Sequence, residues 1–314
     1  MSPALVTEDP PIVLSTHGLT KDFRTRRKNL RAVDDLDLSI RRGDVFGFLG
    51  PNGAGKTTTI RLMFGLIYPT RGYVEVAGHR VPDDRQEALR HMAGFVDDPT
   101  FYGNMTARRN LRLIASMYGP VSEDRITEVL EIVGLVERGD TKVGGYSHGM
   151  RQRLGIALAL IHKPDIIVLD EPTSGLDPAG MKDVRELIRD LAKDGTTVFL
   201  SSHLLHEVEL VANRAAVVSK GRLLKQGPVS ELHPTSAGVK IKTADQRRAW
   251  EVLKPLVGPQ SIEQDEEYIK VQAADDAVPD LVARLVADGA RIQAVVPAIE
   301  QSLEDMFLEL TGKD

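Results

Sequence analysis

Hydrophobic positions in the first part of the chain follow two kinds of pattern. Short, unbroken apolar runs cover residues 45–49, 166–169 and 196–200, and each ends at glycine or polar residues. Apolar residues recur at helical spacing over 56–66 and 184–191. Unbroken runs of this length predict strands covered on both faces, as in a parallel sheet. The last two runs and the helix between them therefore predict a βαβ unit.

Three other short segments, 12–14, 36–40 and 73–76, have strand-like patterns separated by turn residues. They predict a small antiparallel layer beside the parallel sheet. Residues 85–143 carry mostly helical patterns and lack runs rich in β-forming residues. We therefore expect a helical subdomain over about 85–150.

The C-terminal part has a pattern of its own. Its order of strand, helix, strand, strand, helix, strand is that of a ferredoxin-like α+β domain, and a further helix is predicted over 299–310. From residue 237 on there are 15 acidic and 9 basic residues, whereas the preceding residues hold 30 and 31. The change falls in a stretch containing Pro, Ser and Gly, residues 227–238, which predicts a domain boundary. We expect three parts: a disordered tail (1–11), a first domain (12–236) and an accessory domain (237–314).

Composition excludes several classes of protein. The 314 residues are 42% hydrophobic and 27% charged, which is enough apolar material for a sizeable core. A net charge of -5 supplies no basic field for nucleic acid. The chain has no cysteine, which excludes disulfides and thiolate metal sites and fits a reducing compartment. No apolar stretch approaches the roughly 20 residues of a membrane span, and the N-terminus does not look like a secretory signal.

The strongest chemical signal is a glycine-rich loop that fits G-x-x-x-x-G-K-[ST] and stands between a predicted strand and a predicted helix. Glycine lets the main chain approach phosphates closely, and a helix N-terminus attracts anions. Lys56 would neutralise the outer phosphates, and the Thr57 hydroxyl would ligate Mg²⁺. A plain turn with a surface lysine is the competing interpretation, which the flanking strand and helix disfavour. The residues expected to bind the nucleotide here are Gly50, Pro51, Asn52, Gly53, Ala54, Gly55, Lys56, Thr57 and Thr58.

Two carboxylates, Asp170 and Glu171, follow the apolar run at 166–169. This position is the C-terminal edge of a parallel sheet, where ligands bind. Asp170 would hold Mg²⁺ through water, and Glu171 would act as general base on an attacking water. His203 follows the run at 196–200 and would contact the outermost phosphate and orient that water. Taken alone, the acids would be read as solvated and the histidine as structural; the upstream phosphate loop favours catalysis.

Together these residues resemble the nucleotide-binding subunit of an ABC transporter, over about residues 12–231. Residues 146–150 read Tyr-Ser-His-Gly-Met and resemble the family's signature loop, usually Leu-Ser-Gly-Gly-Gln. Ser147 and Gly149 are retained, and His148 replaces the first glycine. The resemblance implies that Ser147 and Gly149 cap a phosphate of ATP. An ordinary helix N-cap is the simpler alternative for Ser147.

The resemblance assigns three further positions. Asp177 belongs to Ser174-Gly175-Leu176-Asp177, which corresponds to the D-loop that contacts the partner subunit. Phe23 stands where the family places an aromatic ring on adenine, and a core position is the alternative. At the Q-loop, where glutamine is usual, the chain has an acid: Asp97 is favoured as the equivalent residue and as a metal ligand, with Asp98 as the alternative. A carboxylate there adds repulsion toward phosphate.

The resemblance implies an α/β fold: a P-loop ABC ATPase core with an antiparallel β layer and a helical subdomain. ATP and Mg²⁺ are the implied cofactors. Two copies of the chain would enclose ATP, the phosphate loop of one facing the signature loop of the other, and hydrolysis would open the pair. In this family the ATPase works with a separate membrane-spanning subunit. The opening movement would pass to that subunit through the groove between the helical subdomain and the Q-loop.

Three segments are similar in sequence to those of bacterial drug or lipid exporter ATPases. They are the signature loop, the acidic Q-loop and Leu303-Glu304-Asp305-Met306-Phe307-Leu308. We therefore expect an ATP-hydrolysing subunit at the cytoplasmic face of the membrane. It would energise export of a small molecule or lipid through a separate multispanning permease. The alternative is a soluble ABC ATPase acting on ribosomes or nucleic acid, which usually carries two cassettes or a long coiled coil. A regulatory module without turnover is disfavoured by the intact Lys56 and Glu171.

Overall fold

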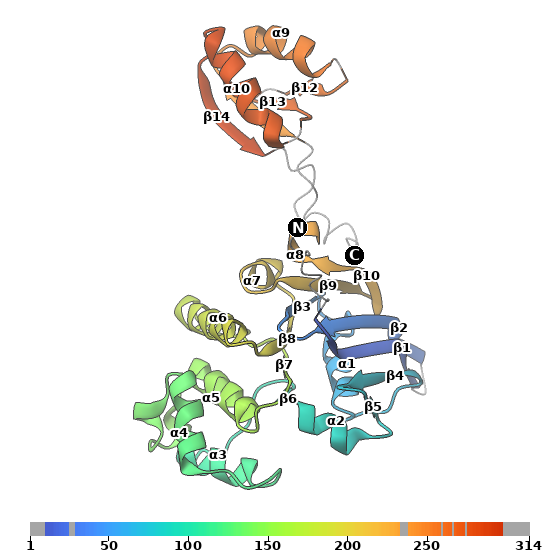
Figure 1. The fold of residues 1–314 in the computed structure, drawn as a ribbon, viewed down its shortest axis with the longest axis vertical. Coiled ribbons are helices and arrows are strands. Elements are labelled where there is room, and N and C mark those ends of the chain that lie inside the picture. The colour runs from blue at the N-terminus through green and yellow to red at the C-terminus, as the bar shows by residue number, and fades with distance from the viewer. Residues whose placement is uncertain are drawn as a thin grey trace, which may run out of the picture. The chain divides into compact units, whose positions relative to one another are not determined.

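The computed structural model describes residues 10–24, 29–232, 238–258, 260–265, 267–273 and 275–297 (Figure 1). The chain divides into two compact units, Met1–Val229 and Ser230–Asp314. The division falls inside the stretch 227–238 that marks the change in composition. The predicted helix over 299–310, residues 303–308 and most of the predicted tail lie outside the described residues. Within the described ranges, every helix is too short or too polar to cross a bilayer.

Two sheets organise the first unit. The smaller is antiparallel with strand order β2-β1-β4-β5, which confirms the predicted antiparallel layer. The larger has the order β10-β9-β3-β8-β7-β6, and its neighbours are parallel except for β10 and β9. The strands of the smaller sheet are β1 (Ile12–Arg24), β2 (Asn29–Arg41), β4 (Arg71–Val76) and β5 (His79–Val81). Those of the larger are β3 (Val45–Leu49), β6 (Met92–Phe95), β7 (Ile166–Leu169), β8 (Thr197–Ser202), β9 (Arg214–Ser219) and β10 (Arg222–Pro228).

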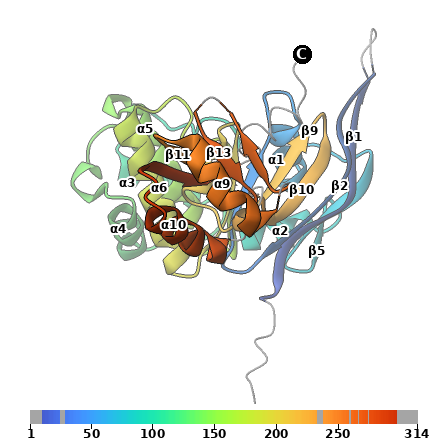
Figure 2. The same cartoon turned by 90° about the horizontal axis from the view of Figure 1, so that it is seen from above.

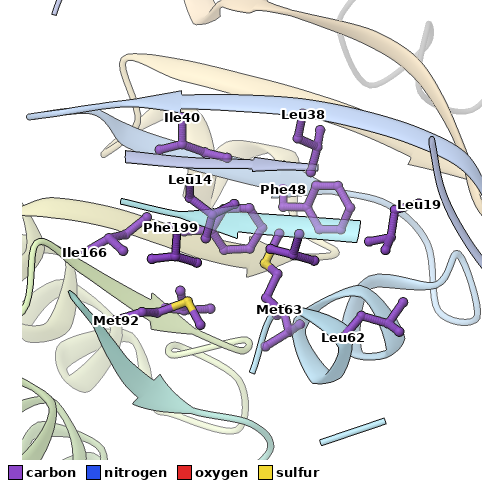
Figure 3. Packing of buried hydrophobic residues seen from close by; sticks show 14 of the residues in the cluster. Leu14, Leu19, Leu38, Ile40, Phe48, Leu62, Met63, Met92, Ile166 and Phe199 are labelled. Carbon is purple, nitrogen blue, oxygen red and sulfur yellow. The ribbon is translucent and has the colours of Figure 1, made fainter. Parts of the chain in front are cut away.

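The strands predicted from unbroken apolar runs are the central ones. Every residue of β3, β7 and β8 is buried. The main core joins both sheets and α1 (Lys56–Met63), as Figure 3 shows. The rings of Phe46 on β3 and Phe199 on β8 stack with centroids 5.8 Å apart. Because β3, β6, β7 and β8 run parallel, their C-terminal ends meet at one edge of the sheet.

The segment predicted to be helical contains one strand that its residue pattern does not predict. Residues 92–95 form β6, which pairs with β7 at the end of the larger sheet. The run is short and has no β-branched residue, so its pattern carries little strand signal. Gly94 is needed at this position, since a Cβ atom there would lie 1.8 Å from the carbonyl oxygen of Val168.

The remaining helices of the first unit cover the sheets or form a separate group. In both views α3, α4 and α5 lie together, on the side of the larger sheet away from the antiparallel one (Figures 1 and 2). The helices are α2 (Arg85–His91), α3 (Ala107–Ala115), α4 (Glu123–Ile132), α5 (His148–Leu160), α6 (Pro178–Lys193) and α7 (Leu205–Glu209), with short 3-10 turns at Val136–Arg138 and Val143–Gly145. α8 (Val229–Leu232) lies at the junction of the two units.

The second unit has the predicted βαββαβ order. Its antiparallel sheet has the order β12-β13-β11-β14, which is that of a ferredoxin-like domain and confirms the prediction. A separate small core fills it, with Ile241, Leu253 and Leu285 fully buried. The elements are β11 (Val239–Thr243), α9 (Gln246–Val257), β12 (Ile262–Gln264), β13 (Ile269–Val271), a 3-10 turn (Asp275–Ala277), α10 (Val278–Ala287) and β14 (Ile292–Pro297).

Candidate active site

The phosphate loop joins β3 to the N-terminus of α1, as predicted. A Cβ atom at Gly50 would lie 2.6 Å from the carbonyl oxygen of Val218, and one at Gly55 would lie 2.2 Å from that of Ala32. Both positions therefore require glycine. Among the described residues, no side chain caps α1, and the first turn of this helix has no acidic residue, which leaves its N-terminus suited to an anion. The other predicted residues occupy the loop or the first turn of the helix: Pro51, Asn52, Gly53, Ala54, Thr57 and Thr58.

The Lys56 ammonium group is buried behind this loop, with its side chain 5% exposed. It donates hydrogen bonds to the carbonyl oxygens of Gly50 (2.7 Å) and Pro51 (3.3 Å). Its Nζ also lies 3.2 Å from Oε1 of Glu171. A buried ammonium needs such partners, and phosphate oxygens are partners of the same chemical kind.

Glu171 stands between two of the predicted residues. Its Oε1 faces Lys56, and its Oε2 lies 2.8 Å from Nδ1 of His203, which follows β8. The backbone of Glu171 has a positive φ of 45°, which is uncommon for a residue with a side chain. Three elements that are distant in sequence thus bring Lys56, Glu171 and His203 together. The carboxylate is thus held at both of its oxygens, which fixes its orientation at the edge of the sheet.

Asp170, at the end of β7, is buried with 4% exposure. Its Oδ1 accepts a hydrogen bond from the Ser201 hydroxyl at 2.5 Å, and the same hydroxyl oxygen accepts one from the backbone N–H of Glu171 at 2.9 Å. Ser201 was not singled out by the sequence, although it lies two residues before His203. The carboxylate of Asp170 and the hydroxyl of Thr57 are oxygen donors of the kind that suits Mg²⁺, together with substrate phosphates.

The two acids after β6 contact different helices. Asp97, with a φ of 61°, pairs through Oδ2 with Arg61 Nη2 of α1 at 2.8 Å. This pair leaves the Q-loop position without a net charge of its own, which reduces the expected repulsion toward phosphate. Asp98 instead accepts a hydrogen bond from Gln152 of α5 at 3.1 Å. Arg61 and Gln152 carry no signal in the sequence alone, because their contacts depend on how the helices pack.

The signature loop forms the start of α5. Ser147 is exposed and caps this helix, accepting a hydrogen bond from the Met150 N–H at 3.2 Å. Gly149 faces the D-loop and the first turn of α6, where a Cβ atom would lie 3.7 Å from Leu176 and 4.0 Å from Gly180. Tyr146 is buried, its hydroxyl donates to the Arg138 carbonyl at 2.6 Å, and burial raises the pKa of that hydroxyl. The tyrosine that replaces leucine is thus accommodated in the interior.

Asp177 caps α6 by accepting a hydrogen bond from the Gly180 N–H at 3.1 Å. Within the described residues, the hydrogen bonds and ion pairs of Ser147 and Asp177 stay in their own helix caps, and none reaches the phosphate loop. The structure therefore brings the phosphate-loop lysine, the carboxylates and His203 together, and leaves the signature and D-loop residues outside that cluster.

Phe23 lies near the end of β1 and is 37% exposed. The Lys21 ammonium is 5.1 Å from its ring centroid. Phe23 is absent from the buried core that β1 otherwise supplies with Val13, Leu14 and Leu19. Its ring is thus accessible to a ligand, and its stacking on adenine stays a prediction.

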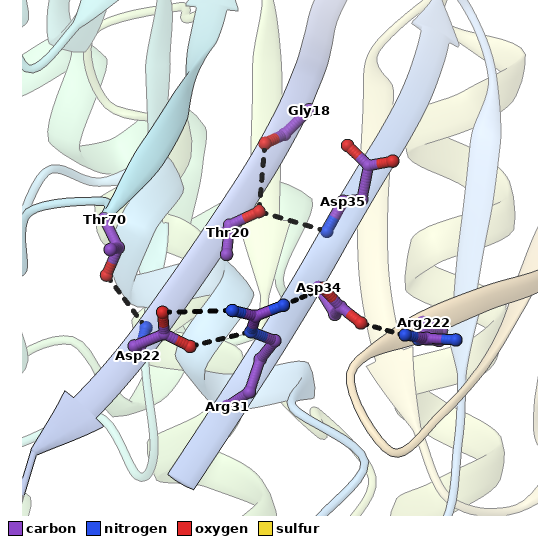
Figure 4. A network of polar contacts seen from close by, with 8 residues as sticks. All are labelled: Gly18, Thr20, Asp22, Arg31, Asp34, Asp35, Thr70 and Arg222. Atoms are coloured by element: carbon purple, nitrogen blue, oxygen red, sulfur yellow. Dashed lines mark hydrogen bonds and ion pairs between the residues drawn. The ribbon is translucent and has the colours of Figure 1, made fainter. Parts of the chain in front are cut away.

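A polar network ties the strand that carries Phe23 to the larger sheet (Figure 4). Arg31 on β2 hydrogen-bonds to Asp22 and Asp34, and Arg222 reaches Asp34 at 2.6 Å. These bonds with arginine hold the pKa of both carboxyls below the usual value. The backbone continues the link to the phosphate loop, since the Asp34 N–H donates to the Gly221 carbonyl and the Gly221 N–H donates to that of Ala54.

Comparison with known proteins identifies the family. The model of the family described as "ABC transporter" matches residues 33–174. The bacitracin transport ATP-binding protein BcrA of Bacillus licheniformis is 39% identical over 303 residues, covering 96% of this chain and 97% of BcrA. The chain belongs to the ATP-binding subunits of ABC transporters.

Two further ABC transporter proteins are similar to this chain. The daunorubicin resistance ATP-binding protein DrrA3 of Streptomyces coeruleorubidus is 35% identical, over 90% of this chain and 92% of that protein. The dimeric structure of MJ0796, a bacterial ABC transporter cassette, is 26% identical, with a TM-score of 0.62 over 69% of this chain and 98% of that one. As an ABC ATP-binding subunit, the chain is an ATPase that uses ATP and Mg²⁺.

Proposed function

We propose that this ABC ATPase energises export of a small molecule or lipid through a separate, multispanning permease. The observation that carries this proposal is the likeness, over almost the entire chain, to proteins named for bacitracin transport and daunorubicin resistance. The chain would act as a peripheral subunit at the cytoplasmic face of the membrane. The alternative, an ATPase acting on ribosomes or nucleic acid, has no support among these relatives.

We infer that two copies of the chain complete each ATP site. Lys56, Asp170, Glu171 and His203 already meet at one sheet edge, while the cap of α5 at Ser147 is exposed. In this arrangement, Glu171 takes the proton of the attacking water, His203 orients Glu171 and contacts the outermost phosphate, and Thr57 and Asp170 hold Mg²⁺. The facing chain supplies Ser147, Gly149 and Asp177. Phe23 stacks on adenine, and Asp97 approaches the metal from the Q-loop.

We further infer that the permease contacts the helical subdomain near α3. Three large apolar side chains are exposed here: Tyr102 (55%), Met117 (78%) and Tyr118 (74%). These side chains precede and follow α3, and exposed apolar groups of this size on the helical subdomain are available for a protein contact. The segment that carries them follows the Q-loop in sequence, which would link this contact to the ATP site.

Co-purification tests the proposed function. The tagged chain, captured from detergent-solubilised membranes of its host, is expected to retain a multispanning protein that stimulates its ATPase activity. The double variant Tyr102→Ser, Met117→Ser should lose that protein but keep basal turnover. Val286→Ser, in the second unit and 58% exposed, is the matched control. Recovery of ribosomal proteins or nucleic acid in place of a membrane protein would contradict the proposal.

A further inference from the structure

His148 contacts two loops that are far apart in the sequence. It is the first residue of α5, and its ring Nε2 lies 3.1 Å from the Ser174 carbonyl oxygen and 3.6 Å from Oδ1 of Asp98. Because a carbonyl oxygen only accepts, Nε2 carries the hydrogen in the contact with Ser174. The ring also lies beside Gly175, where a Cβ atom would be 3.5 Å from Nε2. One side chain therefore touches both the loop after β6 and the D-loop after β7.

A second side chain of α5 reaches the same acid. Gln152 stands four residues after His148, so the two share one face of the helix. It is 1% exposed, and its Nε2 donates to Oδ1 of Asp98 at 3.1 Å. The same carboxylate oxygen, Oδ1 of Asp98, thus accepts the hydrogen bond of the buried amide and lies 3.6 Å from Nε2 of the imidazole. Asp98 is therefore anchored to α5 and helps to position the ring of His148.

The D-loop end of this contact leads to the candidate general base. The Ser174 N–H donates to the carbonyl oxygen of Glu171 at 3.0 Å. The Glu171 carboxylate in turn meets Lys56 and His203. A continuous series of contacts therefore runs from Asp98 through His148 and Ser174 to the backbone of Glu171.

We propose that His148 is a positioning residue: its imidazole ties the D-loop at Ser174 to Asp98, and so fixes the backbone on which Glu171 is held. A glycine at this position, as in the usual signature loop, has no side chain to span these loops. The tether acts within one chain. Its effect on turnover rests on the proposed role of Glu171, but the tether itself does not.

Hydrogen exchange of the full-length, nucleotide-free chain tests the tether directly. In His148→Gly, the amides of residues 174–176 should exchange about 3- to 10-fold faster, which is the range for one lost hydrogen bond. Asp98→Ala should give a similar increase. His148→Gln, which places an amide Nε2 at nearly the same reach, should restore slow exchange. His79→Ala is the matched control, because His79 is similarly exposed and also meets a carboxylate, Asp84, at 2.6 Å.

Kinetics then separate positioning from binding. His148→Gly should lower kcat about 5- to 10-fold, while the affinity for ATP stays within about twofold, as for a modest coupling between sites. The double variant Asp98→Ala, His148→Gly should be no slower than either single variant, since both remove the same tether. Unchanged D-loop exchange in His148→Gly, or effects that multiply in the double variant, would overturn the proposal. If Glu171→Gln kept full turnover, the proposed base would be wrong, whereas the exchange result would stand.

Discussion

Replacing Glu171 by Gln is expected to lower ATP turnover by about 10²- to 10⁴-fold, the contribution of a positioned general base. Glutamine keeps the size of the side chain and one acceptor oxygen, but it has no negative charge and accepts no proton from water. ATP binding should persist, because Lys56 and the phosphate loop are untouched. The bound nucleotide should then hold two chains together, since the step that opens the pair is blocked. Phosphate release and light scattering with ATP and Mg²⁺ measure both effects.

The matched control is Glu186→Gln on α6. Glu186 is exposed and lies 3.7 Å from Lys182, so it is also an acid beside a lysine, but it is far along the helix from the D-loop. It should hydrolyse ATP at the wild-type rate. If Glu171→Gln hydrolysed ATP at close to the wild-type rate, Glu171 would not be the general base.

Lys56→Ala should weaken ATP binding itself, by about 10- to 100-fold, as expected when a hydrogen bond to a charged group is lost. The ammonium is the buried cation of the phosphate loop, and its loss also leaves Glu171 with one partner fewer. Titration with a fluorescent ATP analogue measures the change in Kd. Turnover should fall as well, through the same loss of bound nucleotide.

Lys193→Ala provides the comparison for this variant. Lys193 pairs with Asp190 at 2.7 Å but is 75% exposed on α6, so its removal should cost little. Its affinity for ATP should match that of the wild type. An unchanged affinity in Lys56→Ala would argue against the phosphate-loop assignment, provided that circular dichroism shows the variant to be folded.

The sequence predicted those parts of the site in which parallel strands alone bring the residues together. Lys56, Glu171 and His203 each follow a strand of the larger sheet, and strands that run parallel bring their C-terminal ends together. Periodicity, rather than parallel topology, predicted the βαββαβ unit, because its strand-like and helix-like segments alternate clearly along the chain. The buried run at 166–169 is a strong signal, since three of its four residues are β-branched and β-branched residues favour strands.

What the sequence left open depends on packing rather than on pattern. β6 was missed because its strand depends on Gly94 fitting against Val168, which no periodicity reports. The pairing of Asp97 with Arg61, and of Asp98 with Gln152, joins elements whose relative placement is decided by the whole core. Adjacent acids that look equivalent in sequence therefore have separate partners in the fold.

The most direct test of the account asks whether the signature loop of one chain closes the ATP site of another. Ser147→Arg is added to Glu171→Gln, and the mass is measured by light scattering with ATP and Mg²⁺. We expect that Glu171→Gln alone has the mass of two chains, whereas the double variant still binds ATP through its own phosphate loop but has the mass of one chain. A double variant that still forms the ATP-dependent pair would contradict the claim that two chains share each nucleotide.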